Sequence, residues 1–161
     1  MKITTSEIIK APYEEKLHNQ ITKFYFTLTQ EQDSFTLSLE QIQESSQLVL
    51  LYNEDEEIVG VAGLRKMFLH SRYFMVVHKD YQGKGYGKKI ISKILTAYPK
   101  RSLLLLSVGR SNLNARRLYN TVDFKTIYRH KTMAFMLYNN KSGQWFRWPV
   151  LLFIFIKSKL S

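Results

Sequence analysis

The spacing of apolar residues changes along the chain and predicts an N-terminal helical region followed by alternating strands and helices. A stripe of four apolar residues recurs at near-helical spacing: Leu17, Ile21, Phe24 and Leu28. Pro12 fits the first turn of this helix. Ser38 followed by Gln41 is typical of a capping box and predicts a short second helix. We therefore expect the chain before the first hairpin to be helical.

Strand patterns begin with "QLVLLYNEDEEIVGVAGLRKMF", which predicts a hairpin around the acidic turn Asn53–Glu57. Further strands are predicted at 72–78, at 124–130 and at 131–138, and the unbroken apolar run 102–108 is typical of a strand buried on both faces. Helices are predicted at 88–98 and at 112–122, the second capped by Ser111 or Asn112. The order β-β-β-α-β-α-β-β indicates an α/β domain with a mixed sheet.

Three alternating glycines, Gly83, Gly85 and Gly87, lie between the strand 72–78 and the helix 88–98. A strand, a glycine loop and a helix together present free backbone N–H groups and a positive dipole end to an anion. Lysines 84, 88 and 89 add positive charge there. The spacing matches neither the P-loop motif G-x-x-x-x-G-K-[ST] nor the dinucleotide-binding motif G-x-G-x-x-G, so the sequence predicts neither of these two phosphate-binding loops.

Charge is distributed unevenly over the 161 residues, which carry a net charge of +11. Residues 1–60 hold four basic and eleven acidic residues, a net −7, whereas residues 61–161 hold twenty basic and two acidic residues, a net +18. A solvated basic face, a nucleic-acid or membrane surface, and a site for a multiply phosphorylated small ligand all fit the basic part.

Cysteine is absent, which excludes disulfides, thiolate metal sites and a cysteine acyl-enzyme and is compatible with the cytoplasm, where we expect the protein. The four histidines show no H-x-x-x-H spacing, so we expect no metal. The N-terminus lacks the apolar stretch of a secretory signal.

Two motifs resemble the GNAT superfamily of N-acetyltransferases. Residues 82–87, "QGKGYG", match its acetyl-CoA pyrophosphate loop Q/R-x-x-G-x-G/A. Residues 112–124, "NLNARRLYNTVDF", resemble its N-x-x-A-x-x-L-Y-x-x-x-G-F. The resemblance covers about residues 45–137. Lys79 stands where the family usually has proline, and Asp123 where it has glycine.

The resemblance implies a GNAT-like mixed, largely antiparallel sheet with a splayed parallel strand pair, in which 72–78 opens away from 102–108. It implies acetyl-CoA as the acetyl donor, with Tyr119 as the general acid toward the CoA thiolate. Backbone groups around Met75, Val76 and Val77 would hold the pantetheine arm and polarise the thioester carbonyl. The remaining expected cofactor-binding residues are Gln82, Gly83, Lys84, Gly85, Tyr86, Gly87, Lys88 and Asn112.

Transfer to the acceptor is expected to be direct, in a ternary complex, because no cysteine is available to carry the acetyl group. The acceptor is expected to be a small-molecule or peptide primary amine, and the acidic first sixty residues favour a cationic one. Relatives often use a glutamate as the base, yet residues 58–161 contain only Asp80 and Asp123 as acids. His70, Tyr73 and His78 are other candidates, and water alone is a further alternative.

Two other functions remain open. A non-catalytic CoA-binding or regulatory module would explain the absence of an obvious carboxylate base. A basic nucleic-acid-binding domain would explain the charge, although the chain carries no recognisable nucleic-acid motif.

The chain divides into an expected acetyltransferase domain, 1–138, and a hydrophobic C-terminal extension, 139–161. Its apolar part, Trp145–Ile156, has twelve residues, too few for the about 20 of a membrane-spanning helix. It could form an extra strand, within the sheet or across a homodimer, or a peripheral membrane anchor, or a poorly ordered extension.

Overall fold

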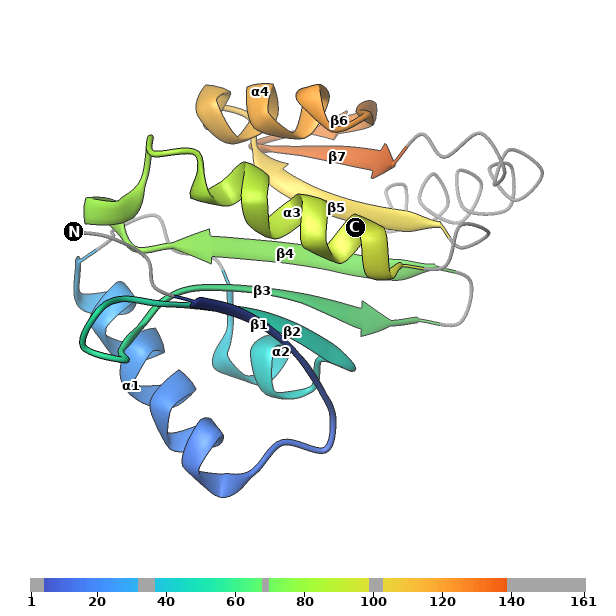
Figure 1. Cartoon of the computed structure of the whole chain (residues 1–161). Helices are drawn as coiled ribbons and strands as arrows, with labels where there is room; N and C mark the ends of the chain where they lie inside the picture. The colour runs from blue at the N-terminus through green and yellow to red at the C-terminus, as the bar shows by residue number, and fades with distance from the viewer. Residues whose placement is uncertain (1–4, 32–36, 68–69, 99–102, 139–161) are drawn as a thin grey trace. The chain divides into compact units, whose positions relative to one another are not determined.

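The computed structural model describes residues 5–31, 37–67, 70–98 and 103–138, which form twelve helices and strands (Figure 1). In chain order these are β1 (Thr5–Lys10), α1 (Glu15–Glu31), α2 (Leu39–Gln43), β2 (Gln47–Tyr52), β3 (Ile58–Lys66), β4 (Ser71–Val77), the 3₁₀ helix η1 (Lys79–Tyr81), α3 (Tyr86–Ala97), β5 (Leu104–Gly109), α4 (Leu113–Thr121), β6 (Phe124–His130) and β7 (Met133–Tyr138). The expectations for the extension 139–161 lie outside the described residues.

The described strands form a mixed, mostly antiparallel sheet with the order β1-β2-β3-β4-β5-β7-β6, flanked by helices. The parallel pair is β4 with β5, in which Ser71 pairs with Leu104 and Arg72 with Leu105. The predicted fold class is confirmed. By its internal contacts the chain divides into two compact units, unit 1 (residues 1–65 and 74–95) and unit 2 (residues 66–73 and 96–161).

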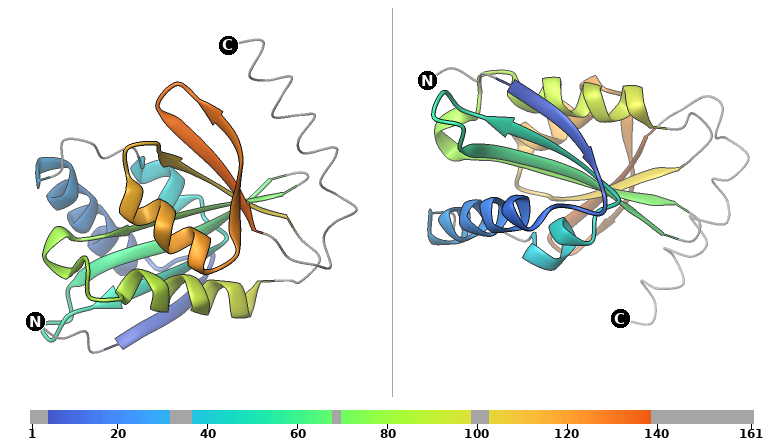
Figure 2. Two further views of the ribbon diagram at one scale, coloured as in Figure 1. Left: turned by 90° about the horizontal axis from the view of Figure 1, so that it is seen from above. Right: turned by 60° about the horizontal axis from the view of Figure 1, so that its bottom comes forward.

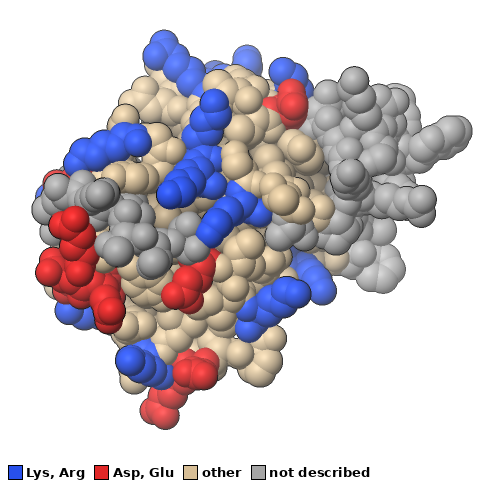
Figure 3. Space-filling model, in the orientation of Figure 1, with Lys and Arg blue, Asp and Glu red and all other residues tan. Residues whose placement is uncertain are grey.

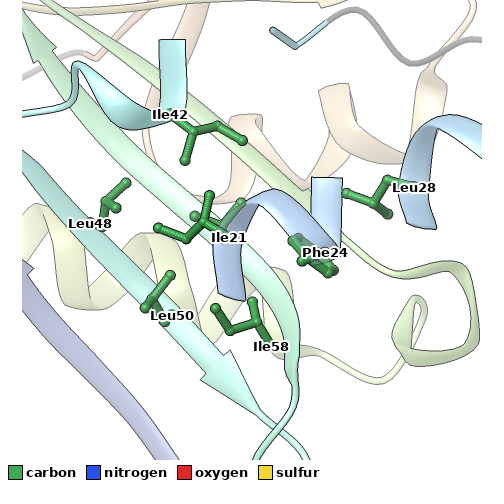
Figure 4. Close-up of a cluster of buried hydrophobic side chains, with 8 residues drawn as sticks. Ile21, Phe24, Leu28, Ile42, Leu48, Leu50 and Ile58 are labelled. Atoms are coloured by element: carbon green, nitrogen blue, oxygen red, sulfur yellow. The ribbon is translucent and has the colours of Figure 1, made fainter. Parts of the chain in front are cut away.

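In unit 1, α1 and α2 cover one face of β2 and β3 (Figure 2). The predicted stripe of α1 supplies Ile21, Phe24 and Leu28, all buried, and Leu17 packs against them (Figure 4). Ile42 of α2 joins them, together with Leu48 and Leu50 of β2 and Ile58 and Val61 of β3. Burial of this apolar surface holds α1 on the sheet. Each Å² of apolar surface removed from water contributes about 25 cal/mol to the stability of the fold.

The capping box expected at α2 is present and confirms that prediction. The Ser38 hydroxyl accepts a hydrogen bond from the Gln41 N–H, and the Gln41 side chain accepts one from the Ser38 N–H, both at 3.2 Å. These two bonds satisfy backbone donors that a helix start leaves free.

The N-terminal region departs from the prediction in two ways. Residues Thr5–Lys10 form the strand β1 where only helix was expected, and α1 begins at Glu15, so Pro12 lies before the helix. Each residue of β1 pairs with one of β2, from Thr5 with Tyr52 to Lys10 with Gln47. Its own sequence has only two apolar residues, Ile8 and Ile9. The strand therefore depends on pairing with residues of β2 that lie more than 35 positions away in the chain.

In unit 2, β5 pairs with β7 and β7 with β6, both antiparallel. Leu103, Leu105 and Leu137 form a buried cluster against which Ile127 packs. The strands and the helix predicted over 102–138 are all present, with ends shifted by no more than a few residues.

Asp123 lies between α4 and β6 with a φ of 66°. Only glycine adopts this left-handed region without steric cost, although aspartate tolerates it better than most residues. This left-handed backbone conformation explains why the motif N-x-x-A-x-x-L-Y-x-x-x-G-F has glycine at the position of Asp123.

We expect Asp123→Gly to stabilise the fold by up to about 1 kcal/mol, because it removes this steric cost. Asp123→Ala, which keeps a Cβ and loses the polar side chain, should destabilise it instead. Urea unfolding of the three proteins measures both differences. A glycine variant less stable than the alanine variant would show that φ does not set the energetics here.

Candidate functional site

The end of β4 leads into a short 3₁₀ turn in unit 1. The His78 N–H donates to the Val59 carbonyl at 2.9 Å, which ties the end of β4 to β3. The Gln82 amide Nε2 donates to the Val77 carbonyl at 2.8 Å and so fastens the start of the glycine loop to the strand. The turn η1 between these two bonds fixes where the loop begins.

Gly83 and Gly85 have φ values of 75° and 82°, the left-handed region that favours glycine. A Cβ added to either residue would meet no heavy atom within 4 Å, so the space beside the loop is open. Backbone conformation therefore requires glycine at these two positions, a reason that the sequence pattern did not indicate. Gly87 is different because it is the second residue of α3.

Backbone donors of this loop are free. Among the described residues, no acceptor faces the N–H groups of residues 83–88, whereas the next N–H along, that of Lys89, donates to the Gly85 carbonyl at 3.2 Å. A helix start leaves such donors unsatisfied and carries a partial positive charge. Six consecutive donors and open space beside the glycines are chemically suited to a large oxyanion such as a diphosphate.

The lysines contribute charge at the same place. The Lys84 ammonium donates to the Asp80 carbonyl at 2.7 Å and lies 5.6 Å from the centre of the Tyr81 ring, which braces the loop against η1. Lys88 and Lys89 are exposed on the first turn of α3. Each adds positive charge beside the free N–H groups.

Met75, Val76 and Val77 lie in the part of β4 that belongs to unit 1. The Val77 carbonyl is already used by Gln82. The contact of these three residues with a pantetheine arm, and the opening of 72–78 away from 102–108, stay predictions.

Tyr86, another predicted site residue, is the first residue of α3 in unit 1, and helix α4 in unit 2 has Asn112 as its N-cap and contains Tyr119. The Asn112 Oδ1 atom accepts from the Ala115 N–H at 3.0 Å, so of the two predicted caps Asn112 is the one used. Tyr119 is 6% exposed and packs edge-on against Tyr73 and tilted against Phe124, with ring centroids 6.2 and 5.8 Å away. Burial raises the pKa of Tyr119, so its hydroxyl holds its proton at neutral pH.

The three candidate bases differ in environment. Burial, reinforced by the Tyr119 hydroxyl, raises the pKa of Tyr73 well above its ordinary value, which makes Tyr73 a poor base. Partial burial and the Arg72 charge lower the pKa of His70, which favours its neutral form. The Nδ1 atom of His78 accepts from the Asp80 N–H at 3.4 Å and lies 3.7 Å from its carboxylate.

An open groove of about 660 Å³ lies in unit 1 between α1 and the turn that joins β2 to β3, and its lining includes His78 and Asp80. Four consecutive acidic residues line it, Glu54, Asp55, Glu56 and Glu57. Figure 3 shows acidic side chains gathered near this turn. The sequence showed the acidic turn but not the groove, because α1 is distant along the chain.

No group of three or more His, Cys, Asp or Glu side chains in the described ranges is placed to hold a metal ion. No helix in those ranges has the length and hydrophobicity to cross a membrane.

Comparison with known proteins agrees with this geometry. A family model described as the acetyltransferase (GNAT) domain matches residues 9–137. No curated protein matches the sequence.

Solved structures with a similar fold include several acetyltransferases. A GNAT-family acetyltransferase from Staphylococcus aureus Mu50 has a TM-score of 0.64 at 21% identity, covering 83% of this chain and 98% of its own. Escherichia coli ElaA has a TM-score of 0.67 at 14% identity, covering 84% and 99%. The ribosomal-protein-S18-alanine N-acetyltransferase of Escherichia coli has a TM-score of 0.59 at 17% identity, covering 83% and 91%. At these identities the likeness shows the fold alone.

Proposed function

Because the chain belongs to the GNAT acetyltransferase family, we propose that it is an acetyl-CoA-dependent N-acetyltransferase acting on a primary amine. Transfer is direct, within a ternary complex of protein, acetyl-CoA and amine. The geometry of the loop 82–88 carries the proposal. It combines free backbone N–H groups, two glycines with left-handed φ values, and open space beside those glycines.

The loop fits the diphosphate of coenzyme A. The N–H groups of residues 83–88 would hold its oxygens, and Lys84 and Lys88 would balance its charge. A side chain at Gly83 or Gly85 would occupy the space that such an oxyanion needs and would also strain the backbone. Gln82 positions the loop through its bond to Val77.

Acetyl-CoA supplies an activated acetyl group and a sulfur leaving group. Tyr119 holds a proton for that sulfur, and its buried, neutral hydroxyl is suited to donate it. Met75, Val76 and Val77 would bind the arm that carries the thioester, and Asn112 would contribute near the start of α4. Cysteine is absent from the chain, which supports direct transfer without an acyl-enzyme.

The acceptor must react as a neutral amine. A lysine-like amine has a pKa of roughly 10 and is almost entirely cationic at pH 7. The described strands carry no buried carboxylate to remove the proton, so we name no base; His70, His78 and water remain the candidates for this step. Activity should therefore rise with pH as the amine loses its proton.

A cationic amine is the acceptor class that unit 1 supports. The acidic groove would raise the local concentration of cations through long-range attraction. Such attraction weakens as salt screens it, because the Debye length is about 10 Å at 0.1 M.

An acceptor screen tests the proposal. Release of free CoA thiol is followed with acetyl-CoA and pools of polyamines, aminoglycosides, peptides and anionic amino compounds. We expect turnover with cationic amines, with a KM that rises with salt. A preference for anionic acceptors would contradict the cationic class.

The non-catalytic CoA-binding or regulatory module is the second candidate, favoured because residues 58–161, with Asp80 and Asp123 as their only acids, offer no obvious carboxylate base. It predicts acetyl-CoA binding without thiol release in any pool. Salt-dependent binding of DNA or RNA that CoA does not displace would instead favour a nucleic-acid-binding domain.

A further inference from the structure

The hydroxyl of Tyr73 is a buried polar group without a hydrogen-bond partner in the described part of the chain. The Tyr73 side chain is 3% exposed. By contrast, the hydroxyl of Tyr98, also buried in unit 2, donates to the Leu103 carbonyl at 3.0 Å. Buried phenol hydroxyls usually have a partner, because an unsatisfied one loses its hydration without replacement. The hydroxyl of Tyr73 is therefore an unused hydrogen-bond donor that a ligand could engage.

Tyr73 lies beside the residue that we assign as the proton donor. Within unit 2, its ring meets Tyr119 edge to face, at an interplanar angle of 89° and a centroid distance of 6.2 Å. Phe124 packs against both rings. Tyr73 also follows directly after Ser71 and Arg72, the two residues that pair with β5. A ligand group that reaches Tyr119 would be close to Tyr73 as well.

The protonation state limits what Tyr73 can do. Burial and the neighbouring Tyr119 raise the pKa of Tyr73 well above 10, so its hydroxyl stays neutral throughout the physiological range. A neutral phenol donates a hydrogen bond and removes no proton from an amine. Tyr73 is therefore a poor general base, the role that the sequence left open for it.

We propose that Tyr73 is a second coenzyme-binding residue, whose hydroxyl donates a hydrogen bond to the sulfur end of acetyl-CoA beside Tyr119. The inference rests on the proposed function, since it takes its ligand from there. Tyr73 keeps its proton and stabilises negative charge that develops at the thioester, while Tyr119 gives its own proton to the sulfur. Aromatic packing alone does not explain Tyr73, because phenylalanine would pack equally well without burying a free hydroxyl.

Titration calorimetry with two ligands tests this role. Acetyl-CoA carries the thioester, and desulfo-CoA keeps the nucleotide and the arm but lacks the sulfur. Tyr73→Phe should weaken acetyl-CoA binding about threefold to tenfold, as expected for one lost hydrogen bond, and leave desulfo-CoA binding unchanged. Tyr138→Phe is the matched control, because Tyr138 packs against the same Phe124, and it should change neither affinity.

Thermal unfolding of the free protein adds an independent measurement. Tyr73→Phe should raise the melting temperature, because it removes a buried hydroxyl that has no partner. A lower melting temperature would mean that the hydroxyl has a partner in the protein, and would overturn the inference. Unchanged affinity for both ligands, or equal weakening of both, would overturn it as well.

Failure of the proposed function would look different. In that case the wild-type protein would bind neither acetyl-CoA nor desulfo-CoA. If wild-type protein binds both ligands and Tyr73→Phe binds them identically, the proposed function stands and only the role of Tyr73 is wrong.

Discussion

Tyr119→Phe is expected to lower kcat by about a hundredfold to a thousandfold with any acceptor found in the screen, within the usual range for loss of a general acid. Phenylalanine keeps the ring that packs against Tyr73 and Phe124, so the fold and acetyl-CoA affinity should change little. The reason for the loss is chemical, because the sulfur must then leave as an unprotonated thiolate. Steady-state thiol release and calorimetry on the same preparation separate the two effects.

The pH profile gives this prediction a second test. Burial raises the pKa of Tyr119, so its hydroxyl remains protonated as the pH rises toward 10, and activity should keep increasing there as the amine deprotonates. Tyr138→Phe serves as the control and should retain wild-type kcat. A Tyr119→Phe enzyme within twofold of wild type at every pH would show that another group, or water, protonates the sulfur.

The double variant Gly83→Val/Gly85→Val is expected to weaken acetyl-CoA binding by about a hundredfold. Valine is strongly disfavoured at φ values of 75° and 82°, so the loop must change conformation and the N–H groups between 83 and 88 lose their alignment. Losing two charge-assisted hydrogen bonds at about 1.5 kcal/mol each gives about 3 kcal/mol, and every 1.4 kcal/mol is a factor of ten in affinity.

Gly109→Ala is the matched control for the loop variant. Its φ is not left-handed, and an added Cβ would meet atoms of Asn112 and Ser111 only at an ordinary 3.9 Å. We expect near wild-type affinity for this variant. If the double valine variant is folded and binds acetyl-CoA within threefold of wild type, the loop does not hold the diphosphate.

Much of the fold could be predicted from the sequence, because most elements carry their own local signal. The capping box at Ser38 and Gln41 and the four leucines 103–106 that lead into β5 depend on residues close together in the chain. The strand β1 has no such signal, since Ile8 is 40% exposed and pairing with β2 creates the strand.

The candidate site likewise has features encoded by neighbouring residues and features that depend on contacts between distant residues. The glycine loop could be predicted, because backbone conformation, strand and helix are all encoded between residues 72 and 98. The free hydroxyl of Tyr73 could not, because its environment depends on Tyr119 and Phe124, more than 40 residues away. The acidic groove likewise needs α1 beside a turn that lies far from it in the chain.

Amide hydrogen exchange on the wild-type protein, with and without acetyl-CoA, examines the loop most directly. We expect saturable binding that slows exchange at the backbone N–H groups of residues 83–88, which have no acceptor elsewhere in the described chain. Saturating acetyl-CoA that leaves exchange at these six amides unchanged, or an absence of binding by well-folded protein, would contradict the account.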